Sequence, residues 1–416
     1  MKVLFISNFY PPSKQGLGYM QLCEEVADGL AARGHSVAVL TSTDLDGDEQ
    51  ERPYPVYRQL EIDPDWINGQ STSRQFFFER RRKEALAMST FSKLIKEFQP
   101  DIIFVWHAIG LPKAMLKEAE AVGKPVVVYY LADYQPEIGD EYEDYWRRES
   151  HHPLARLTKK PLASLALFML AREGKPIRLQ YQHAICVSGY VRQRLVTGGF
   201  IPGSSVVIHN GVDLSQFTSG SPRLVQPQAE KLRLIVAGRI LPLKGIHTIV
   251  EAFASLADQP EIHKLSLTIL GDGPVDYIES LKKIISNHNL QKVIHFQSPV
   301  PRRDMPDVLS RHDGLILASE YDEPLARAIQ EAMAMELLIL GTVTGGSGEL
   351  LVNERTGLVF KAGDPLSLAA QLTRTVQDPD LVTRLRKAGR KEIEENFSIQ
   401  RTILQVEEYL RACMDS

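Results

Sequence analysis

The segment that most constrains the fold is residues 314–336, where an apolar run leads through a short acidic turn into a helix. Leu315 to Ala318 has the composition of a buried strand. Pro324 favours the first turn of a helix, where a missing N–H costs nothing. Apolar residues then recur at helical spacing: Leu325, Ala328, Ile329, Ala332 and Met333. In an open α/β sheet, such a turn lies at the carboxyl edge of the strands, where ligands bind.

The start of this helix is also a candidate anion site with a carboxylate at either end. The first free N–H groups, near Leu325, Ala326 and Arg327, would face a phosphate. Glu323 precedes the helix and Glu331 follows eight residues later, a rise of roughly 12 Å. The spacing predicts a nucleotide-sugar site, with one carboxylate on each side of a diphosphate. The alternative, two ordinary glutamates at a helix start and on a helix surface, stays open.

Strands and helices alternate along the whole chain, which predicts two doubly wound α/β domains facing a cleft. The first begins with a strand at Lys2 to Ser7, a helix at Tyr19 to Arg33 and a strand at Ser36 to Thr41. Residues 44–75 are polar and irregular. A Ser/Pro/Gln-rich linker at 218–230 marks a boundary. We therefore expect domains at 1–217 and 218–396, followed by a final amphipathic helix within 397–416.

Composition narrows the class of protein. The 416 residues carry a formal net charge of −4, which does not favour nucleic acid as a partner. Three cysteines lack metal-ligand spacing, so a reduced, cytoplasmic compartment is expected. No apolar run approaches the length of a membrane-spanning helix.

Two cations follow the first strand of the second half. Arg239 and Lys244 lie five residues apart beside glycines, where they can neutralise a diphosphate without a metal. Gly238 and Gly271, at the ends of two successive strands, are expected at the same nucleotide-sugar. If a diphosphate leaves during the reaction, the cations stabilise its developing charge.

The first half offers weaker candidates. Gly16 and Gly18 lie in a loop at a helix entrance, where glycine permits close approach of a ligand. His107 and Asp133 each end a predicted strand, and a satisfied structural role is the favoured interpretation of His107. Residues Asp44, Asp46 and Asp48 form an alternating run that could hold a divalent cation, although a solvated loop is the commoner explanation.

Residues 156–178 combine the apolar run LASLALFMLA with basic flanks. Such a segment could lie in an anionic membrane surface. The competing interpretation, which we favour, is a helix packed on the core with its lysine heads reaching water.

Several motifs of the chain, taken together, resemble those of a known family. V-A-G-R-x4-K-G, L-G-D-G-P, E-x7-E-A-M-A, G-G-x-x-E and the earlier N-G-V-D occur in family order. Together with the N-terminal S-N-F-Y-P-P-x-x-x-G, they resemble the retaining glycosyltransferases of the GT-B fold, family 4, also called glycosyl transferases group 1. The resemblance covers nearly the whole chain and rests on the combination of motifs.

The resemblance implies a hexosyltransferase-type enzyme that uses a nucleotide-sugar, needs no metal and retains the anomeric configuration. Arg239 and Lys244 would bind the donor diphosphate, and Gly16 would lie at the phosphate. Glu331 would bind the ribose, and Glu323 the sugar hydroxyls. The final helix would cross back to the first domain.

Two departures from the family pattern affect the sugar pocket. Glu323-Pro324-Leu325-Ala326 replaces the common Glu-Gly-Phe-Gly, and Ala132-Asp133 replaces a His-Asp pair. The acceptor, whether a sugar, a lipid-linked group or a small molecule, is left open. Alternative functions are a glucan synthase, a sugar-nucleotide epimerase and a non-catalytic nucleotide-sugar-binding protein. A nicotinamide dehydrogenase is disfavoured because G-x-G-x-x-G is absent.

Overall fold

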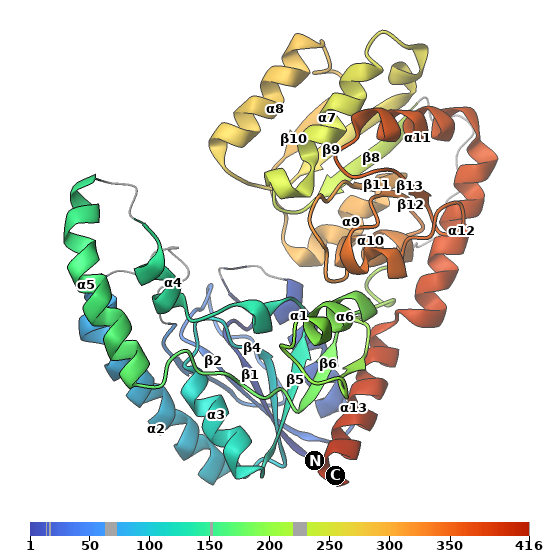
Figure 1. Cartoon of the computed structure of the whole chain (residues 1–416). Coiled ribbons are helices and arrows are strands. Elements are labelled where there is room, and N and C mark those ends of the chain that lie inside the picture. The colour runs from blue at the N-terminus through green and yellow to red at the C-terminus, as the bar shows by residue number, and fades with distance from the viewer. Residues whose placement is uncertain (14, 16–17, 63–72, 150–152, 219–230, 416) are drawn as a thin grey trace. The chain divides into compact units, whose positions relative to one another are not determined.

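The computed structural model divides the chain into two compact units, each built on one parallel sheet (Figure 1). It describes residues 1–13, 15, 18–62, 73–149, 153–218 and 231–415. The first unit comprises Met1–Val187, Val191–Ile208 and Ile403–Ser416. The second comprises Ser188–Tyr190 and His209–Thr402.

The first unit has a sheet with the strand order β3-β2-β1-β4-β5-β6-β7, in which all pairings are parallel. Because parallel strands are covered on both faces, most of them are continuous apolar runs. The strands are β1 (Lys2–Ser7), β2 (Ser36–Ser42), β3 (Val56–Leu60), β4 (Ile102–His107), β5 (Val126–Leu131), β6 (His183–Cys186) and β7 (Val206–Val207).

Aromatic side chains fill the centre of this sheet's core. Trp106 on β4 stacks on Tyr130 of β5 at 4.3 Å between ring centroids, and Phe104 meets Phe5 edge-on. The helices of this unit are α1 (Gly18–Ala32), α2 (Arg80–Phe98), α3 (Lys113–Val122), α4 (Glu141–Arg147), α5 (Pro153–Arg172) and α6 (Gly189–Thr197), which begins in residues of the second unit.

Strand β3 corrects the expectation that residues 44–75 are irregular. Val56 pairs with Val39 of β2, and the ladder continues to Leu60. The strand is at the edge of the sheet, where Arg58 and Gln59 can remain polar, so it lacks the apolar run of a central strand. Its sequence alone therefore resembled a loop.

The second unit has a parallel sheet of order β10-β9-β8-β11-β12-β13. Its first strand, β8, lies in the middle: β9 and β10 are added on one side of β8, and β11, β12 and β13 on the other. The strand order therefore switches between β8 and β11. Ligands bind at such a switch point in doubly wound folds. The strands are β8 (Leu232–Ala237), β9 (Leu265–Leu270), β10 (Ile294–Gln297), β11 (Gly314–Leu317), β12 (Leu338–Gly341) and β13 (Leu358–Val359).

Helices of the second unit pack on a buried apolar core that includes Ile249, Phe253, Leu267 and Leu340. The helices are α7 (Ile246–Ser255), α8 (Val275–Asn287), α9 (Met305–Ser310), α10 (Arg327–Ala334), α11 (Pro365–Gln377) and α12 (Pro379–Asn396). The two doubly wound sheets confirm the predicted fold class.

The final helix, α13 (Ile399–Asp415), belongs with the first unit from Ile403 onward. There Glu407 is bonded by Arg33, His35 and Arg411. The predicted linker lies almost wholly outside the described residues, and the boundaries at 217 and 396 stay predictions. Within the described residues, no helix is long and apolar enough to cross a membrane. The three cysteines are buried, and none forms a disulfide within the described part of the chain.

Candidate functional site

The carboxyl ends of β8 and β9 are joined through two glycine turns. The N–H of Gly238 donates to the carbonyl of Leu270, and the N–H of Ile240 donates to that of Asp272. Gly271 has a φ of 153°, and a Cβ there would lie 1.9 Å from the carbonyl oxygen of Gly238. Only glycine fits this position, so the two turns form one continuous backbone surface at the sheet edge.

The two predicted cations differ in their surroundings. Arg239 is exposed, and its side chain makes no hydrogen bond or ion pair with any residue the structure describes. Lys244 ends a short 3-10 turn before α7 and is partly buried. The next residue, Gly245, has a φ of 64°, and a Cβ there would lie 2.0 Å from the carbonyl oxygen of Ala318. This close approach brings Lys244 to the end of β11.

Lys244 reaches Glu323 there, across 2.7 Å. Its Nζ also lies 3.0 Å from the hydroxyl of Tyr321, which donates to the other carboxylate oxygen of Glu323 at 2.5 Å. Ser319 donates to the oxygen that Lys244 contacts. Glu323 is therefore a buried carboxylate held by three donors, with the cation beside it rather than in solvent.

The helix after this cluster begins later than predicted. Pro324, Leu325 and Ala326 precede it in non-helical backbone, and α10 starts at Arg327. The carbonyl of Pro324 accepts a hydrogen bond from Ser188 and lies against Gly346, so tertiary contacts override the helix-start preference of proline. Leu325 and Ala326 are buried, and Glu331 is one turn into the helix instead of two.

Glu331 is a second buried carboxylate with cationic partners. Arg302 donates to its Oε1 at 2.6 Å, and Arg327 lies 3.6 Å from the same oxygen. Both contacts that the described residues make with the Glu331 carboxylate are to Oε1. The second oxygen can therefore accept a hydrogen bond from a ligand hydroxyl.

In the first unit, His107 and Asp133 lie together at the ends of β4 and β5. The Nε2 of His107 lies 2.9 Å from Asp133, and Tyr19 stacks on the histidine ring at 4.1 Å between centroids. Burial raises the pKa of Asp133, but His107 and the N–H of Gln135 outweigh burial and hold the pKa below its ordinary value. His107 is almost fully buried, whereas about a third of the Asp133 side chain is exposed. Asp133 can thus present a carboxylate at this edge, with His107 orienting it.

Two other predicted sites are less informative. Gly16 lies outside the described residues. Asp44 accepts a hydrogen bond from Ser13, and no group of three or more potential metal ligands occurs among the residues described. The carboxylates of Asp44, Asp46 and Asp48 therefore do not form a joint site there.

Sequence reasoning missed Tyr321, Ser319 and Arg302. A signal existed for the first two, because residues 319, 321 and 323 occupy alternate positions directly after a predicted strand, and alternate positions of a strand face the same side. Arg302 comes from a turn after β10 and meets Glu331 only through the fold. No local pattern indicates that contact.

Two protein families match consecutive parts of the chain. Residues 20–216 match Glycosyltransferase Family 4, and residues 223–392 match Glycosyl transferases group 1. Together these matches cover most of the chain.

Among curated relatives, the putative glycosyltransferase YtcC of Bacillus subtilis is 26% identical over 253 residues, which are 55% of this chain and 60% of the relative. The putative colanic acid biosynthesis glycosyltransferase WcaL of Escherichia coli is 29% identical over 196 residues, 46% of this chain and 47% of the relative. The matches thus span about half the length of these relatives.

A solved structure extends the likeness to the fold of the whole chain. Anabaena HepE in complex with UDP has a TM-score of 0.68 and 18% identity, and the match covers 99% of this chain and 100% of that one. At this identity the likeness concerns the fold alone. The family matches and the two doubly wound sheets lead to one conclusion: the chain belongs to the group 1 glycosyltransferases of the GT-B fold.

Proposed function

We propose that this protein moves a sugar from a nucleotide-sugar to an acceptor hydroxyl, with retention at the anomeric carbon and without a metal ion. The observation that carries the proposal is the cluster of Lys244, Tyr321 and Glu323, together with the exposed Arg239 of the same loop between β8 and α7. It provides two cations for a diphosphate and one oriented carboxylate for a sugar.

In the proposed reaction, the bond between the anomeric carbon and the diphosphate oxygen breaks while the acceptor oxygen bonds to that carbon. The acceptor proton passes to the leaving diphosphate. Arg239 and Lys244 stabilise the negative charge that develops there. Lys244 is already held by Glu323 and Tyr321, and a preorganised cation needs no rearrangement during the reaction. They supply the positive charge that a metal ion would otherwise supply.

Glu323 and Glu331 are assigned to opposite ends of the donor. Glu323 would accept a hydrogen bond from a sugar hydroxyl, since a carboxylate has about four acceptor sites and the described donors occupy three. Glu331 would accept from a ribose hydroxyl through its second oxygen. Gly16, Gly238, Gly271, Leu325 and Ala326 are assigned to the remaining donor contacts.

The comparisons support a nucleotide-sugar donor and a role in polysaccharide or glycoconjugate synthesis. HepE binds UDP, and WcaL is described as acting in colanic acid biosynthesis. For this chain, the acceptor is a sugar, a lipid-linked group or a small molecule. A cytoplasmic location is part of the proposal, supported by three buried cysteines that form no disulfide among the described residues.

A ligand screen tests the proposal. Thermal unfolding is measured with UDP, GDP, ADP and their sugar conjugates, because a ligand at about a hundred times its Kd stabilises the native state by about 2.7 kcal/mol. The best donor is then incubated with candidate acceptors, with and without excess EDTA. We expect nucleoside diphosphate release and a glycosylated product that form equally in both conditions and keep the donor's anomeric configuration.

Each part of the proposal has its own contradicting result. No stabilisation by any nucleoside diphosphate would contradict the donor site. Complete loss of activity with EDTA, restored by Mg²⁺, would contradict metal independence. Binding without transfer to any acceptor would favour a non-catalytic nucleotide-sugar-binding protein. Inversion at the anomeric carbon would contradict retention alone.

A further inference from the structure

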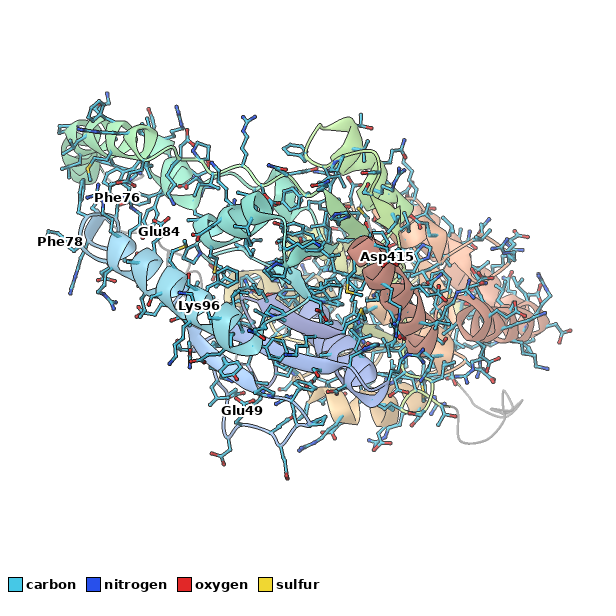
Figure 2. The ribbon with its side chains drawn as sticks, turned by 90° about the horizontal axis from the view of Figure 1, so that it is seen from below. Glu49, Phe76, Phe78, Glu84, Lys96 and Asp415 are labelled. Atoms are coloured by element: carbon cyan, nitrogen blue, oxygen red, sulfur yellow. The ribbon has the colours of Figure 1, made fainter. Side chains whose placement is uncertain are left out.

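From Lys159 onward, where its side chains are described, helix α5 packs on the first unit through one face. Its Ala166 and Leu170 are buried in a small cluster with Phe76, Tyr142 and Trp146, apart from the sheet core. Figure 2 shows Phe76 between α2 and α5, while Phe78 lies on the outer side of α2. This packing agrees with the expectation that the helix packs on the core. It does not account for the residues on the opposite face of α5.

The opposite face is apolar along its centre. Leu165 is 51% exposed and Phe168 is 63% exposed, and Leu162 continues the row one turn earlier. The three residues are spaced at three-residue intervals, so they lie along one side of the helix. A fold that needed α5 only as core packing would not require leucine and phenylalanine at these outward positions.

Basic residues border this apolar row. Lys160 and Arg172 are both exposed, and α5 contains no aspartate or glutamate between Pro153 and Arg172. Lys159, by contrast, points inward and donates to the carbonyls of Tyr145 and Arg148. The outer face of α5, defined by Lys160, Leu162, Leu165, Phe168 and Arg172, is therefore both apolar and cationic.

We propose that the outer face of α5 binds an anionic lipid surface, with the helix axis parallel to the membrane. Leu165 and Phe168 would enter the boundary between headgroups and acyl chains, as apolar faces of interfacial helices do. Lys160 and Arg172 would meet lipid phosphates, and their attraction adds to the apolar burial. This inference does not depend on the proposed function.

A second copy of the chain fits this face less well. A two-fold contact through it would place Lys160 and Arg172 of one copy near the same residues of the other, without an α5 carboxylate to neutralise them. Three exposed apolar side chains also provide little area compared with the roughly 800 Å² per partner of a stable interface. An anionic lipid surface supplies both the opposite charge and the apolar phase.

Vesicle flotation tests the inference with the full chain. Binding is measured on vesicles of phosphatidylcholine alone and of phosphatidylcholine with phosphatidylglycerol, at low and high NaCl. One variant combines Leu165→Ser with Phe168→Ser, and another combines Lys160→Glu with Arg172→Glu. Matched controls on α3 are Val122→Ser and Lys117→Glu, which change an exposed apolar and an exposed basic residue elsewhere in the same unit.

We expect wild-type protein to bind the anionic vesicles, and binding to fall with salt because screening shortens the reach of surface charge. The Lys160→Glu and Arg172→Glu variant should lose at least about tenfold in partitioning, since each basic residue near such a surface contributes about a fivefold preference. The Leu165→Ser and Phe168→Ser variant should also lose at least about tenfold, because it removes the apolar side chains that enter the lipid. The α3 controls should bind like wild type, and all variants should keep the wild-type unfolding temperature because the changed side chains are exposed.

Three results would overturn the inference. The first is no binding to anionic vesicles, and the second is equal binding to neutral ones. The third is wild-type binding by both α5 variants. Dimerisation in the absence of vesicles that the Leu165→Ser and Phe168→Ser variant abolishes would instead assign the face to a second copy.

Discussion

The carboxyl edges of the two sheets have similar backbones but different chemistry. In the second unit, the edge joins glycine turns to cations, with Arg239 exposed and Lys244 bonded to a buried Glu323. In the first unit, the edge is aromatic and polar, with Tyr19 stacked on His107 and a partly exposed Asp133. Both edges belong to parallel, doubly wound sheets, so the fold does not determine what each one binds.

Under the proposed function, the second edge would bind the donor and the first edge the acceptor. A diphosphate needs positive charge and close backbone approach, which the second edge has. An acceptor hydroxyl needs a hydrogen-bond acceptor, which the first edge has in the partly exposed carboxylate of Asp133. The predictions below test this division, beginning with the largest expected effect.

Lys244→Ala should cause the largest loss, because it removes a cation from the leaving diphosphate and leaves Glu323 buried without its ionic partner. Turnover should fall by about a hundredfold or more, the loss typical of removing one preorganised donor in a transition state. Arg239→Ala should cost about tenfold, since this exposed side chain holds nothing else in the described structure. Steady-state kinetics at saturating donor measure both, and Lys283→Ala on the surface of α8 is the control. Near-normal turnover in both variants would show that these cations do not serve the donor.

The two glutamates of the second edge should separate nucleotide from sugar. Glu331→Gln should weaken binding of the nucleoside diphosphate and of the whole donor alike, by about tenfold, because the ribose contact is common to both. Glu323→Gln should leave nucleoside diphosphate affinity unchanged, lower turnover and relax discrimination among donor sugars. Calorimetric titration of each variant gives the affinities, with Glu279→Gln on α8 as the control. Equal loss of nucleoside diphosphate affinity in both variants would contradict the assignment.

Asp133→Asn tests the other edge. The carboxylate with the lowered pKa becomes a neutral amide, which is a poorer acceptor for a hydroxyl. We expect kcat/KM for the acceptor to fall by several-fold to tenfold while donor affinity stays unchanged. The decisive comparison is between the fold-change in kcat/KM for the acceptor and the fold-change in donor affinity. A loss of nucleoside diphosphate affinity would place Asp133 with the donor and remove the division between the edges.

The sequence predicted the fold well because its signals are local. Buried parallel strands such as Ile102 to His107 are continuous apolar runs, and a glycine after a strand marks a turn whatever surrounds it. Strand β3 was missed because an edge strand has only one neighbour and tolerates Arg58 and Gln59.

The candidate site was less predictable because it depends on contacts between distant segments. Motif spacing selected Lys244 and Glu323 but did not show that they bond to each other, or that Tyr321 completes the cluster. Arg302 reaches Glu331 from another turn of the chain. The start of α10 was placed three residues too early because the contacts of Pro324 outweigh its local preference. The roles of all these residues stay predictions until the variants are measured.

The smallest expected effect concerns stability and should leave the second edge untouched. Glu407 on α13 is bonded by Arg411, Arg33 and His35, and these contacts lower its pKa from the ordinary 4.5 to about 2. Because folding favours the charged form, the contribution is fully present above pH 4.5 and is lost as the pH falls towards 2. Glu407→Gln should lower the free energy of unfolding at neutral pH by about 1–2 kcal/mol, a modest value because Arg33 and Arg411 are about half exposed.

Urea unfolding of wild type and Glu407→Gln between pH 7 and pH 3 measures this contribution, and the neighbouring exposed Glu408→Gln is the control. The difference between Glu407→Gln and wild type should shrink steadily below pH 4.5, because protonation removes from the wild type the charge that the variant already lacks. A difference that stays constant with pH would instead reflect packing around residue 407. Nucleoside diphosphate affinity should be the same in all three proteins, since the affected contacts belong to the first unit and the proposed donor site to the second.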